Sequence, residues 1–118
     1  VNCKLAGTIL TGSYIDNVSF TDAVQNGIDF DNSSLMNVEF IRCSLKSSSF
    51  SNITFKNLDF SDCDMEETNF SNTSMNGLDL RTCNISGLIT YAKDIKGVIL
   101  TSEQSLAFIK LLGITIID

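Results

Sequence analysis

The chain contains no histidine, no proline and no tryptophan, and only 19% of its 118 residues are charged. Without histidine it lacks the side chain that most often serves as general base or metal ligand near neutral pH. No nucleophile lies beside a recognisable base, and no glycine-rich phosphate-binding loop is present. These absences predict a protein that is not an enzyme and holds no cofactor or metal.

Cysteine is scarce and never occurs as a CxxC pair. Cys3, Cys43, Cys63 and Cys83 lie far apart in the sequence, which argues against a zinc site. No apolar run reaches transmembrane length, and the first residues do not resemble a secretory signal. We therefore expect a cytoplasmic protein, away from the membrane, whose thiols stay reduced.

Basic residues are also few, with 8 against 14 acidic residues and a net charge of −6. A protein that binds the nucleic-acid backbone needs a basic surface, so direct binding of nucleic acid is not expected. The acidic excess is compatible with a basic partner or with solubility alone. The length and the hydrophobic content of 43% predict one globular domain.

Large apolar residues return at every fifth position between residues 5 and 100. Eighteen of the twenty positions are large and apolar, and seven of the eight phenylalanines are among them. They are Leu5, Leu10, Ile15, Phe20, Phe30, Leu35, Phe40, Leu45, Phe50, Phe55, Phe60, Met65, Phe70, Met75, Leu80, Ile85, Ile95 and Leu100. A helix repeats every 3.6 residues and a strand every 2, so neither keeps this set on one face. The chain must turn a corner within each unit, and we predict a core built on these seven phenylalanines.

A longer period of twenty residues is superimposed on the first. Asn17, Asn37, Asn57, Gly77 and Gly97 are spaced by twenty, and all tolerate the left-handed backbone conformation. A second inward position, two residues before each large one, carries small residues that include all four cysteines. Four five-residue sides then make one square coil, and successive coils stack about 4.8 Å apart as in a β ladder.

The units "CDMEE", "TNFSN" and "IDFDN" resemble the motif of the pentapeptide-repeat family. The resemblance covers residues 1–100 and implies an all-β repeat solenoid. In that family the solenoid is a right-handed quadrilateral β-helix, here of about five coils at one coil per twenty residues.

The last part of the chain has a different pattern. "TSEQSLAFIKLLG" predicts a helix with Thr101 and Gln104 as a capping box and Gly113 after its end. Its apolar residues cover more than one face, so we expect one side to cap the last coil and the other to meet a partner. We predict that residues 101–118 cap the rod and form a homodimer; the alternative is that the tail "ITIID" covers the helix. The predicted dimer residues are Leu106, Phe108, Ile109, Leu111, Leu112 and Ile114.

The ending "GVIL" followed by "SLAFIKLLGITIID" resembles the C-terminus of the bacterial Qnr-type quinolone-resistance proteins. The resemblance implies a dimer formed through this helix and binding to DNA gyrase and topoisomerase IV. It also implies a rod that imitates duplex DNA in shape and charge. The alternative function is a general repeat scaffold whose partner is unrelated to DNA enzymes.

Acidic residues supply the candidate surface for such a partner. On a twenty-residue coil Glu39, Asp59 and Asp79 fall in one outward column. Stacked like charges repel, so their retention favours use against a basic groove, whereas the alternative is a solvated polar face. The predicted partner-binding residues are Asp22, Glu39, Asp59, Asp62, Asp64, Glu66, Glu67 and Asp79.

Several features are expected to be structural. The inward cysteines are interpreted as compact packing residues rather than a disulfide or metal site. The pairs Asn26-Gly27 and Asn76-Gly77 fall at predicted corners, although such pairs ordinarily indicate hairpins. Two units break the inward pattern. At Gln25 we expect a local bulge that turns Val24 inward, and around Thr90 and Lys93 a short excursion; a ligand pocket at either is the alternative.

Overall fold

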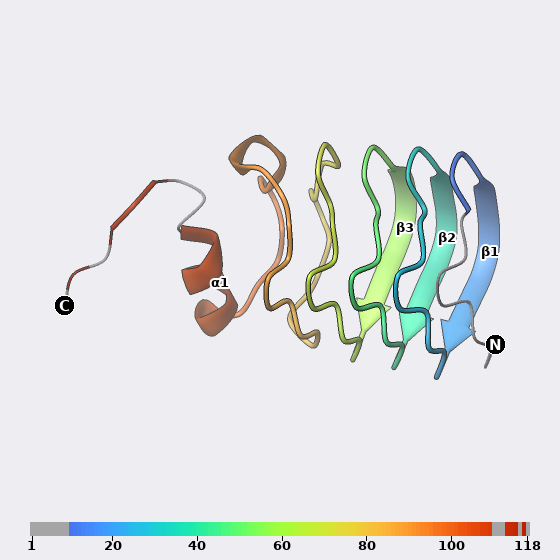
Figure 1. Cartoon of the computed structure of the whole chain (residues 1–118), viewed down its shortest axis with the longest axis horizontal. Helices are drawn as coiled ribbons and strands as arrows, with labels where there is room; N and C mark the ends of the chain where they lie inside the picture. The colour runs from blue at the N-terminus through green and yellow to red at the C-terminus, as the bar shows by residue number, and fades with distance from the viewer. Residues whose placement is uncertain (1–9, 110–112, 116, 118) are drawn as a thin grey trace.

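The computed structural model describes residues 10–109, 113–115 and 117, and its centre is a parallel sheet of three strands. The strands are β1 (Tyr14–Thr21), β2 (Ser34–Ile41) and β3 (Thr54–Ser61), in the order β1-β2-β3. Each residue pairs with the residue twenty positions later, as in Val18 with Val38 and Val38 with Leu58. The rungs therefore stack along the long axis, with helix α1 at the opposite end from β1 (Figure 1).

Backbone pairing continues outside the named strands with the same spacing. One column of bridges joins Val24, Ser44, Asp64 and Asn84, and a second joins Asp29, Ser49, Asn69 and Ile89. A further bridge joins Asp79 to Ile99. Because pairings recur at about every fifth residue and always to the next twenty-residue turn, the chain is a repeat β-helix with four sides to each turn.

The corners are made by residues in the left-handed conformation. Asn17, Asn37 and Asn57 have φ values of 57°, 53° and 56°, and the strand register skips them because the chain bends there. Gly77 and Gly97 both have φ of 84°, so the twenty-residue series predicted from the sequence is confirmed. Corner residues also include Arg42 and Glu67, which seldom adopt this conformation and are held in it by the neighbouring turns.

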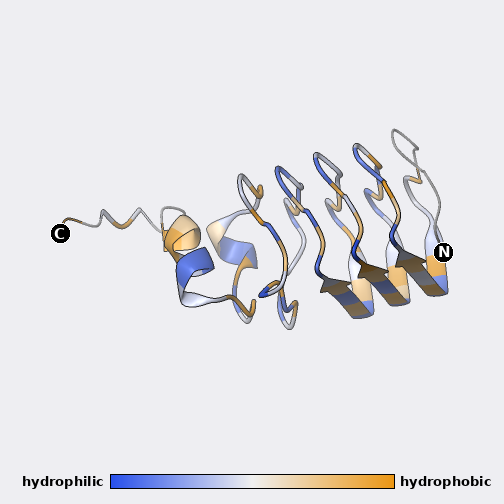
Figure 2. Ribbon diagram, turned by 90° about the horizontal axis from the view of Figure 1, so that it is seen from below, coloured by the Kyte–Doolittle hydropathy of each residue, from blue (hydrophilic) through white to orange (hydrophobic). Residues whose placement is uncertain are grey.

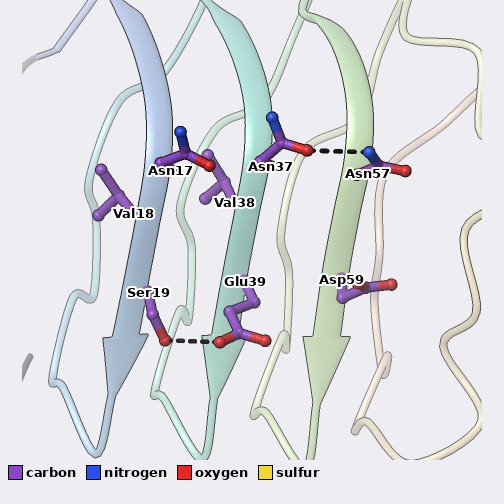
Figure 3. Close-up of a pocket in the computed structure, with 8 residues that line it drawn as sticks. All are labelled: Asn17, Val18, Ser19, Asn37, Val38, Glu39, Asn57 and Asp59. Atoms are coloured by element: carbon purple, nitrogen blue, oxygen red, sulfur yellow. Dashed lines mark hydrogen bonds between the residues drawn. The ribbon is translucent and has the colours of Figure 1, made fainter.

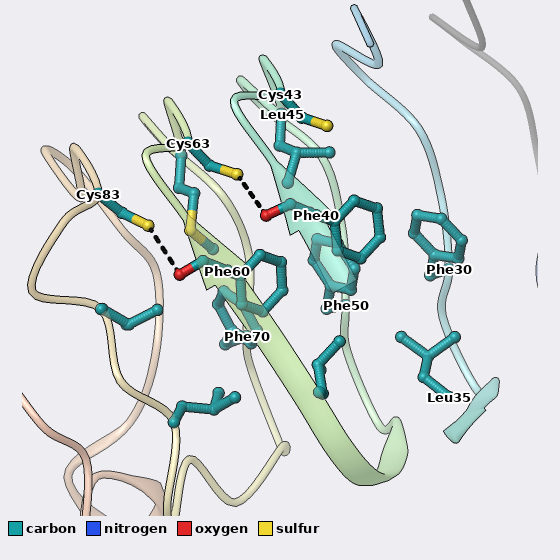
Figure 4. Packing of buried hydrophobic residues seen from close by; sticks show 14 of the residues in the cluster. Phe30, Leu35, Phe40, Cys43, Leu45, Phe50, Phe60, Cys63, Phe70 and Cys83 are labelled. Atoms are coloured by element: carbon teal, nitrogen blue, oxygen red, sulfur yellow. Dashed lines mark hydrogen bonds between the residues drawn. The ribbon is translucent and has the colours of Figure 1, made fainter. Parts of the chain in front are cut away.

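Phenylalanine rings form two interleaved stacks inside the coil (Figure 4). Phe30, Phe50 and Phe70 stack with centroids 5.0 and 5.2 Å apart, and each contacts the second stack edge-on. The second stack consists of Phe20, Phe40 and Phe60. All six rings are buried, whereas Phe55 is half-buried and packs against the same cluster. Offset and edge-on ring pairs of this kind stabilise a core beyond the burial of area alone.

The small inward position has a hydrogen-bonding role that the sequence analysis did not anticipate. Its hydroxyl or thiol donates to a carbonyl 23 residues earlier, for example Ser48 Oγ to Gln25 O at 2.9 Å and Thr73 Oγ1 to Phe50 O at 2.6 Å. Cys63 Sγ donates likewise to Phe40 O at 3.2 Å (Figure 4). These donors join each corner carbonyl to the next turn, and some of these carbonyls, such as Gln25 O, also accept a main-chain hydrogen bond within their own turn.

The packing role of the cysteines is confirmed for the three that the structure describes. Cys43, Cys63 and Cys83 are buried and form no disulfide. Burial raises the pKa of the Cys43 thiol, which keeps it protonated and unreactive. Cys3 lies outside the described residues.

The prediction of a bulge at Gln25 is wrong. Gln25 is fully buried at the large inward position, whereas Val24 is 41% exposed and bridges to Ser44. The main chain keeps its register because Gln25 N donates to Ser44 O at 2.7 Å, as its counterparts in later turns do. The carboxamide therefore enters an apolar core, and neither its nitrogen nor its oxygen has a hydrogen-bond partner within the described part of the chain.

The predicted excursion near Thr90 is a short 3₁₀-helix, η1 (Ala92–Asp94). It changes the main-chain pairing only locally, where Gly77 N donates to Gly97 O. Met75 N still donates to Asp94 O, and Leu80 N still donates to Ile99 O, with the same spacing as in earlier turns. The side chains of Thr90 and Asp94 are buried, and Lys93 lies outside, 3.5 Å from Asp94 Oδ2.

Helix α1 (Ser102–Ile109) covers the end of the last turn. Its capping box is confirmed, because Thr101 N donates to Gln104 Oε1 at 2.9 Å and Gln104 N donates to Thr101 Oγ1 at 3.1 Å. Gln104 Nε2 also donates to Leu80 O and Cys83 O at 2.7 and 2.9 Å. The helix therefore supplies donors to carbonyls that a further turn of the coil would have bound.

Candidate partner-binding face

An acidic column runs along the side of the rod that the second halves of the strands form. Glu39 pairs directly with Asp59 in the register, and Asp79 follows one turn later. Glu39 and Asp59 are exposed, whereas Asp79 is half-buried. Their backbones are about 4.8 Å apart from one turn to the next, so the three carboxylates form a row on a rigid frame.

An asparagine ladder lies beside this column. Asn57 Nδ2 donates to Asn37 Oδ1 at 2.9 Å, and Asn37 Nδ2 donates to Asp16 Oδ1 at 3.1 Å. Asn37 and Asn57 of the ladder, with Glu39 and Asp59 of the column, line a shallow hollow on the strands (Figure 3). Ser19 Oγ donates to Glu39 Oε1 at 2.9 Å within it. The sequence analysis treated these asparagines only as corner residues, and their twenty-residue spacing is the signal that predicts the ladder.

Basic side chains interrupt the negative charge. Arg42 binds Asp22 and Arg81 binds Asp79, both at 2.8 Å, and Lys46 lies 3.4 Å from Asp64. The hydrogen bond from Arg42 lowers the pKa of Asp22, and that from Arg81 lowers the pKa of Asp79. These pairs are solvent-exposed, so they contribute little to stability and mainly reduce the local field.

The structure divides the eight predicted acidic residues between two sides of the coil. Glu39, Asp59 and Asp79 share one side, and Asp22 and Asp62 lie at its edge, on either side of Arg42 in the next column. Asp64 belongs to the following side, where it bridges Ser44 and Asn84. Glu66 and Glu67 lie beyond it, and Glu67 is itself a left-handed corner residue. We call Asp22, Glu39, Asp59, Asp62 and Asp79 the acidic face.

The predicted dimer residues differ in their exposure to solvent. Leu106 and Ile114 are 55% and 52% exposed, and Ile109 is half-buried. Phe108 is buried in the core of its own chain, because it fills the open end of the last turn, so it is removed from the predicted dimer surface. Leu111 and Leu112 lie outside the described residues.

Three exposed apolar residues on the last turn were missed in the sequence analysis. Ile89, Tyr91 and Ile99 are 47%, 51% and 41% exposed. They stand at outward positions where earlier turns carry polar residues such as Asp29, Ser49 and Asp59. Elsewhere hydrophilic and hydrophobic residues alternate along the rungs (Figure 2).

The described part of the chain contains no group of three or more cysteine, aspartate or glutamate side chains placed to hold a metal ion. Within the same residues, no helix is long and apolar enough to cross a membrane.

Comparison with known proteins gives the family. The family described as a pentapeptide repeat region matches residues 33–104, and the description of eight pentapeptide repeats matches residues 13–52. The chain belongs to the pentapeptide-repeat family. No curated protein matches it.

Three solved structures are similar to the chain to different degrees. A pentapeptide-repeat protein of the Arabidopsis thaliana thylakoid lumen is 14% identical with a TM-score of 0.67, over 92% of this chain and 76% of that one. QnrB1, a plasmid-mediated fluoroquinolone resistance protein, is 18% identical with a TM-score of 0.43, over 98% of this chain and 66% of QnrB1. HetL, a protein from a Nostoc cyanobacterium that is involved in the regulation of heterocyst differentiation, is 14% identical with a TM-score of 0.39. The match covers 84% of this chain and 49% of HetL. At 14% identity the likeness to the Arabidopsis thaliana protein shows the fold alone.

Proposed function

We propose that this pentapeptide-repeat protein is a non-enzymatic mimic of duplex DNA whose acidic face binds the basic DNA groove of a type II topoisomerase. The observation that supports the proposal best is the row of Glu39, Asp59 and Asp79 on paired turns of one rigid side. A fixed row of carboxylates can present charge at regular intervals to a partner shaped for phosphates. The Qnr-like C-terminal sequence favours DNA gyrase or topoisomerase IV as the partner and protection against fluoroquinolones as the outcome.

We include three further features in this proposal on the strength of the family resemblance. The coil is right-handed, quadrilateral and of about five turns over residues 1–100, at twenty residues per turn. Residues 101–118 cap the rod and join two copies, with Leu106 and Ile114 as the exposed apolar contacts. The protein acts in the cytoplasm.

The direct test measures binding of the purified chain to DNA gyrase subunits, with linear duplex DNA as competitor. We expect DNA to displace the protein, and added salt to weaken the complex because its contacts are ionic. Absence of binding at micromolar concentrations, or binding that DNA does not affect, contradicts the proposal.

A pair of charge reversals locates the surface. Asp59 is exposed and forms no ion pair with any residue that the structure describes, so Asp59→Lys should not disturb the coil. We expect it to weaken binding at least about tenfold, or about 1.4 kcal/mol. Glu67→Lys makes the same change of charge on another side and should have little effect. Equal losses for both variants would show that total charge, not the acidic face, governs binding.

A scaffold for an unrelated partner is the second candidate. The observation that favours it is the pairing of Asp22, Asp64 and Asp79 with basic residues, which breaks the negative charge into patches. A partner with mixed charges fits such a surface better than a DNA groove does. This candidate predicts no binding to gyrase and retention of a different protein, sensitive to Asp59→Lys, from an extract of the native host.

A further inference from the structure

Two Asn-Gly pairs occupy corners on different sides of the coil, at the same place in the five-residue unit, and their asparagine side chains have different surroundings. Asn26 Oδ1 accepts hydrogen bonds from Ser44 Oγ at 2.6 Å and from Lys46 N at 3.0 Å. Asp31 Oδ1 accepts the same two kinds of bond, from Ser49 Oγ and from Ser51 N. This arrangement, which we call the corner clasp, joins one asparagine or aspartate to the residues 18 and 20 positions later.

The corner clasp is missing at Asn76. The residue 18 positions later is Asp94, whose carboxylate cannot donate a hydrogen bond as Ser44 does. The helix η1 also alters the main chain there, because Gly77 N donates to Gly97 O, whereas Gly27 N donates to the carbonyl of Lys46, twenty positions after Asn26. Asn76 is exposed, and its side chain has no hydrogen bond to any residue in the described ranges.

The carboxamide of Asn76 is nevertheless confined. A Cβ built on Gly97 would lie 1.9 Å from Asn76 Oδ1, so the side chain occupies the space that this glycine leaves open. Asn76 is followed by Gly77, which has no side chain to hinder attack by its own nitrogen. Asn76 therefore combines solvent access, an unclasped carboxamide and a glycine neighbour.

We propose that Asn76 is a site of spontaneous deamidation in the folded protein and that the corner clasp protects Asn26. The hydrogen bond from Gly77 N to Gly97 O opens, and the nitrogen gives its proton to hydroxide and attacks Cγ of Asn76. A C–N bond forms, and the amide nitrogen takes a proton from water and leaves as ammonia. Water then opens the resulting succinimide at either carbonyl and gives aspartate or isoaspartate. The sum is one asparagine and one water converted to one acidic residue and one ammonia.

The product changes the corner in two ways. One negative charge is added in the column that also carries Lys56 and Lys96, twenty residues to either side. Isoaspartate in addition inserts a methylene into the main chain, which opposes the register between Gly77 and Gly97. The reaction is irreversible without a repair enzyme, so the deamidated fraction at Asn76 would increase with the age of the protein.

The test is incubation of the full chain at mildly alkaline pH, followed by peptide mapping with mass spectrometry. We expect Asn76 to react at least about tenfold faster than Asn26, since a tenfold ratio corresponds to about 1.4 kcal/mol, within reach of two hydrogen bonds. In concentrated urea the two rates should converge, because both pairs then have an unstructured Asn-Gly sequence. A folded protein in which Asn26 reacts as fast as Asn76, or in which Asn76 does not react while the urea sample does, overturns the proposal.

Two variants test whether the corner clasp causes the difference between the deamidation rates of Asn26 and Asn76. Ser44→Ala removes one donor to Asn26 and should raise the rate at Asn26 without changing that at Asn76. Asn76→Gln should remove the reaction at this corner while leaving the fold intact by circular dichroism. An unchanged rate at Asn26 in Ser44→Ala would show that the clasp is not what protects it.

Discussion

Phe50 stacks on Phe70 with the ring centroids 5.2 Å apart and the planes inclined by 10°. Phe50 also contacts Phe30, Phe40 and Phe60, so it links the two stacks of rings at the centre of the rod. Both Phe50 and Phe70 are fully buried. A change at Phe50 therefore affects the packing of one turn on either side of it.

We expect Phe50→Ala to lower the free energy of unfolding by about 3–5 kcal/mol, because it removes buried area and leaves a cavity. Lys56→Ala changes an exposed residue on the next side of the coil and should alter the free energy of unfolding by less than about 0.5 kcal/mol. The measurement is urea unfolding followed by circular dichroism. Similar midpoints for the two variants would show that the inward register is wrong.

Gln25→Leu should stabilise the protein by about 1–3 kcal/mol, since the variant no longer buries a carboxamide that has no partner among the described residues. The same substitution at Gln104 should destabilise it by a similar amount. Gln104 Nε2 binds two carbonyls at the end of the rod, and leucine would leave both without this donor. Thermal unfolding of the two variants side by side gives the comparison, and a loss of stability in Gln25→Leu would indicate a partner for this side chain.

Gly97→Ala should cost more stability than Gly77→Ala. Both glycines have φ of 84°, so either alanine carries a conformational strain of about 1–2 kcal/mol. A Cβ at Gly77 meets nothing within 4 Å, whereas one at Gly97 would collide with Asn76 Oδ1. The difference between the two unfolding free energies isolates this contact. Equal values would mean that Asn76 moves aside without cost.

Stability should fall in acid partly through Asp22 and Asp79. Hydrogen bonds from Arg42 and Arg81 lower their folded-state pKa values from the ordinary 3.8. A group whose pKa is lowered on folding stabilises the protein above its unfolded pKa, and this contribution is lost as the pH falls through the folded value. The double variant Arg42→Gln, Arg81→Gln should therefore show a slightly shallower loss of stability below about pH 4, a small change because both pairs are exposed.

The control for this effect is the double variant Lys56→Gln, Lys96→Gln, which removes the same charge from lysines without ion pairs among the described residues. Its pH profile should follow that of the native chain. If both double variants flatten the profile alike, total charge rather than the two ion pairs is responsible.

The fold was predictable because burial alone selects the five-residue pattern, and Leu35, Leu45 and Met65 are fully buried as expected. Gln25 misled the prediction because polarity suggests exposure, whereas the main-chain ladder through Ser44 fixes which residue faces inward. The left-handed conformation of Arg42 was also not predictable, since nothing in its chemistry favours it.

The acidic face was only partly predictable from the sequence. A column of Glu39, Asp59 and Asp79 follows from the twenty-residue period alone. The ion pairs of Asp22 and Asp79 depend on the rotamers of long arginine side chains, which the period does not specify. Phe108 was assigned to a partner because the helix is apolar nearly all round, and only the structure shows which residue fills the end of the rod.

Pairing of the strand residues with those twenty positions later has a consequence for the evolution of this chain. Duplication or deletion of twenty residues would lengthen or shorten the rod by one step of about 4.8 Å and leave every side chain on its original side. A gain or loss of five residues would preserve the core equally well but rotate all later residues by one side, carrying Asp79 away from Glu39 and Asp59. Selection on the interior alone would accept both kinds of event, so only selection on the surface would enforce steps of twenty.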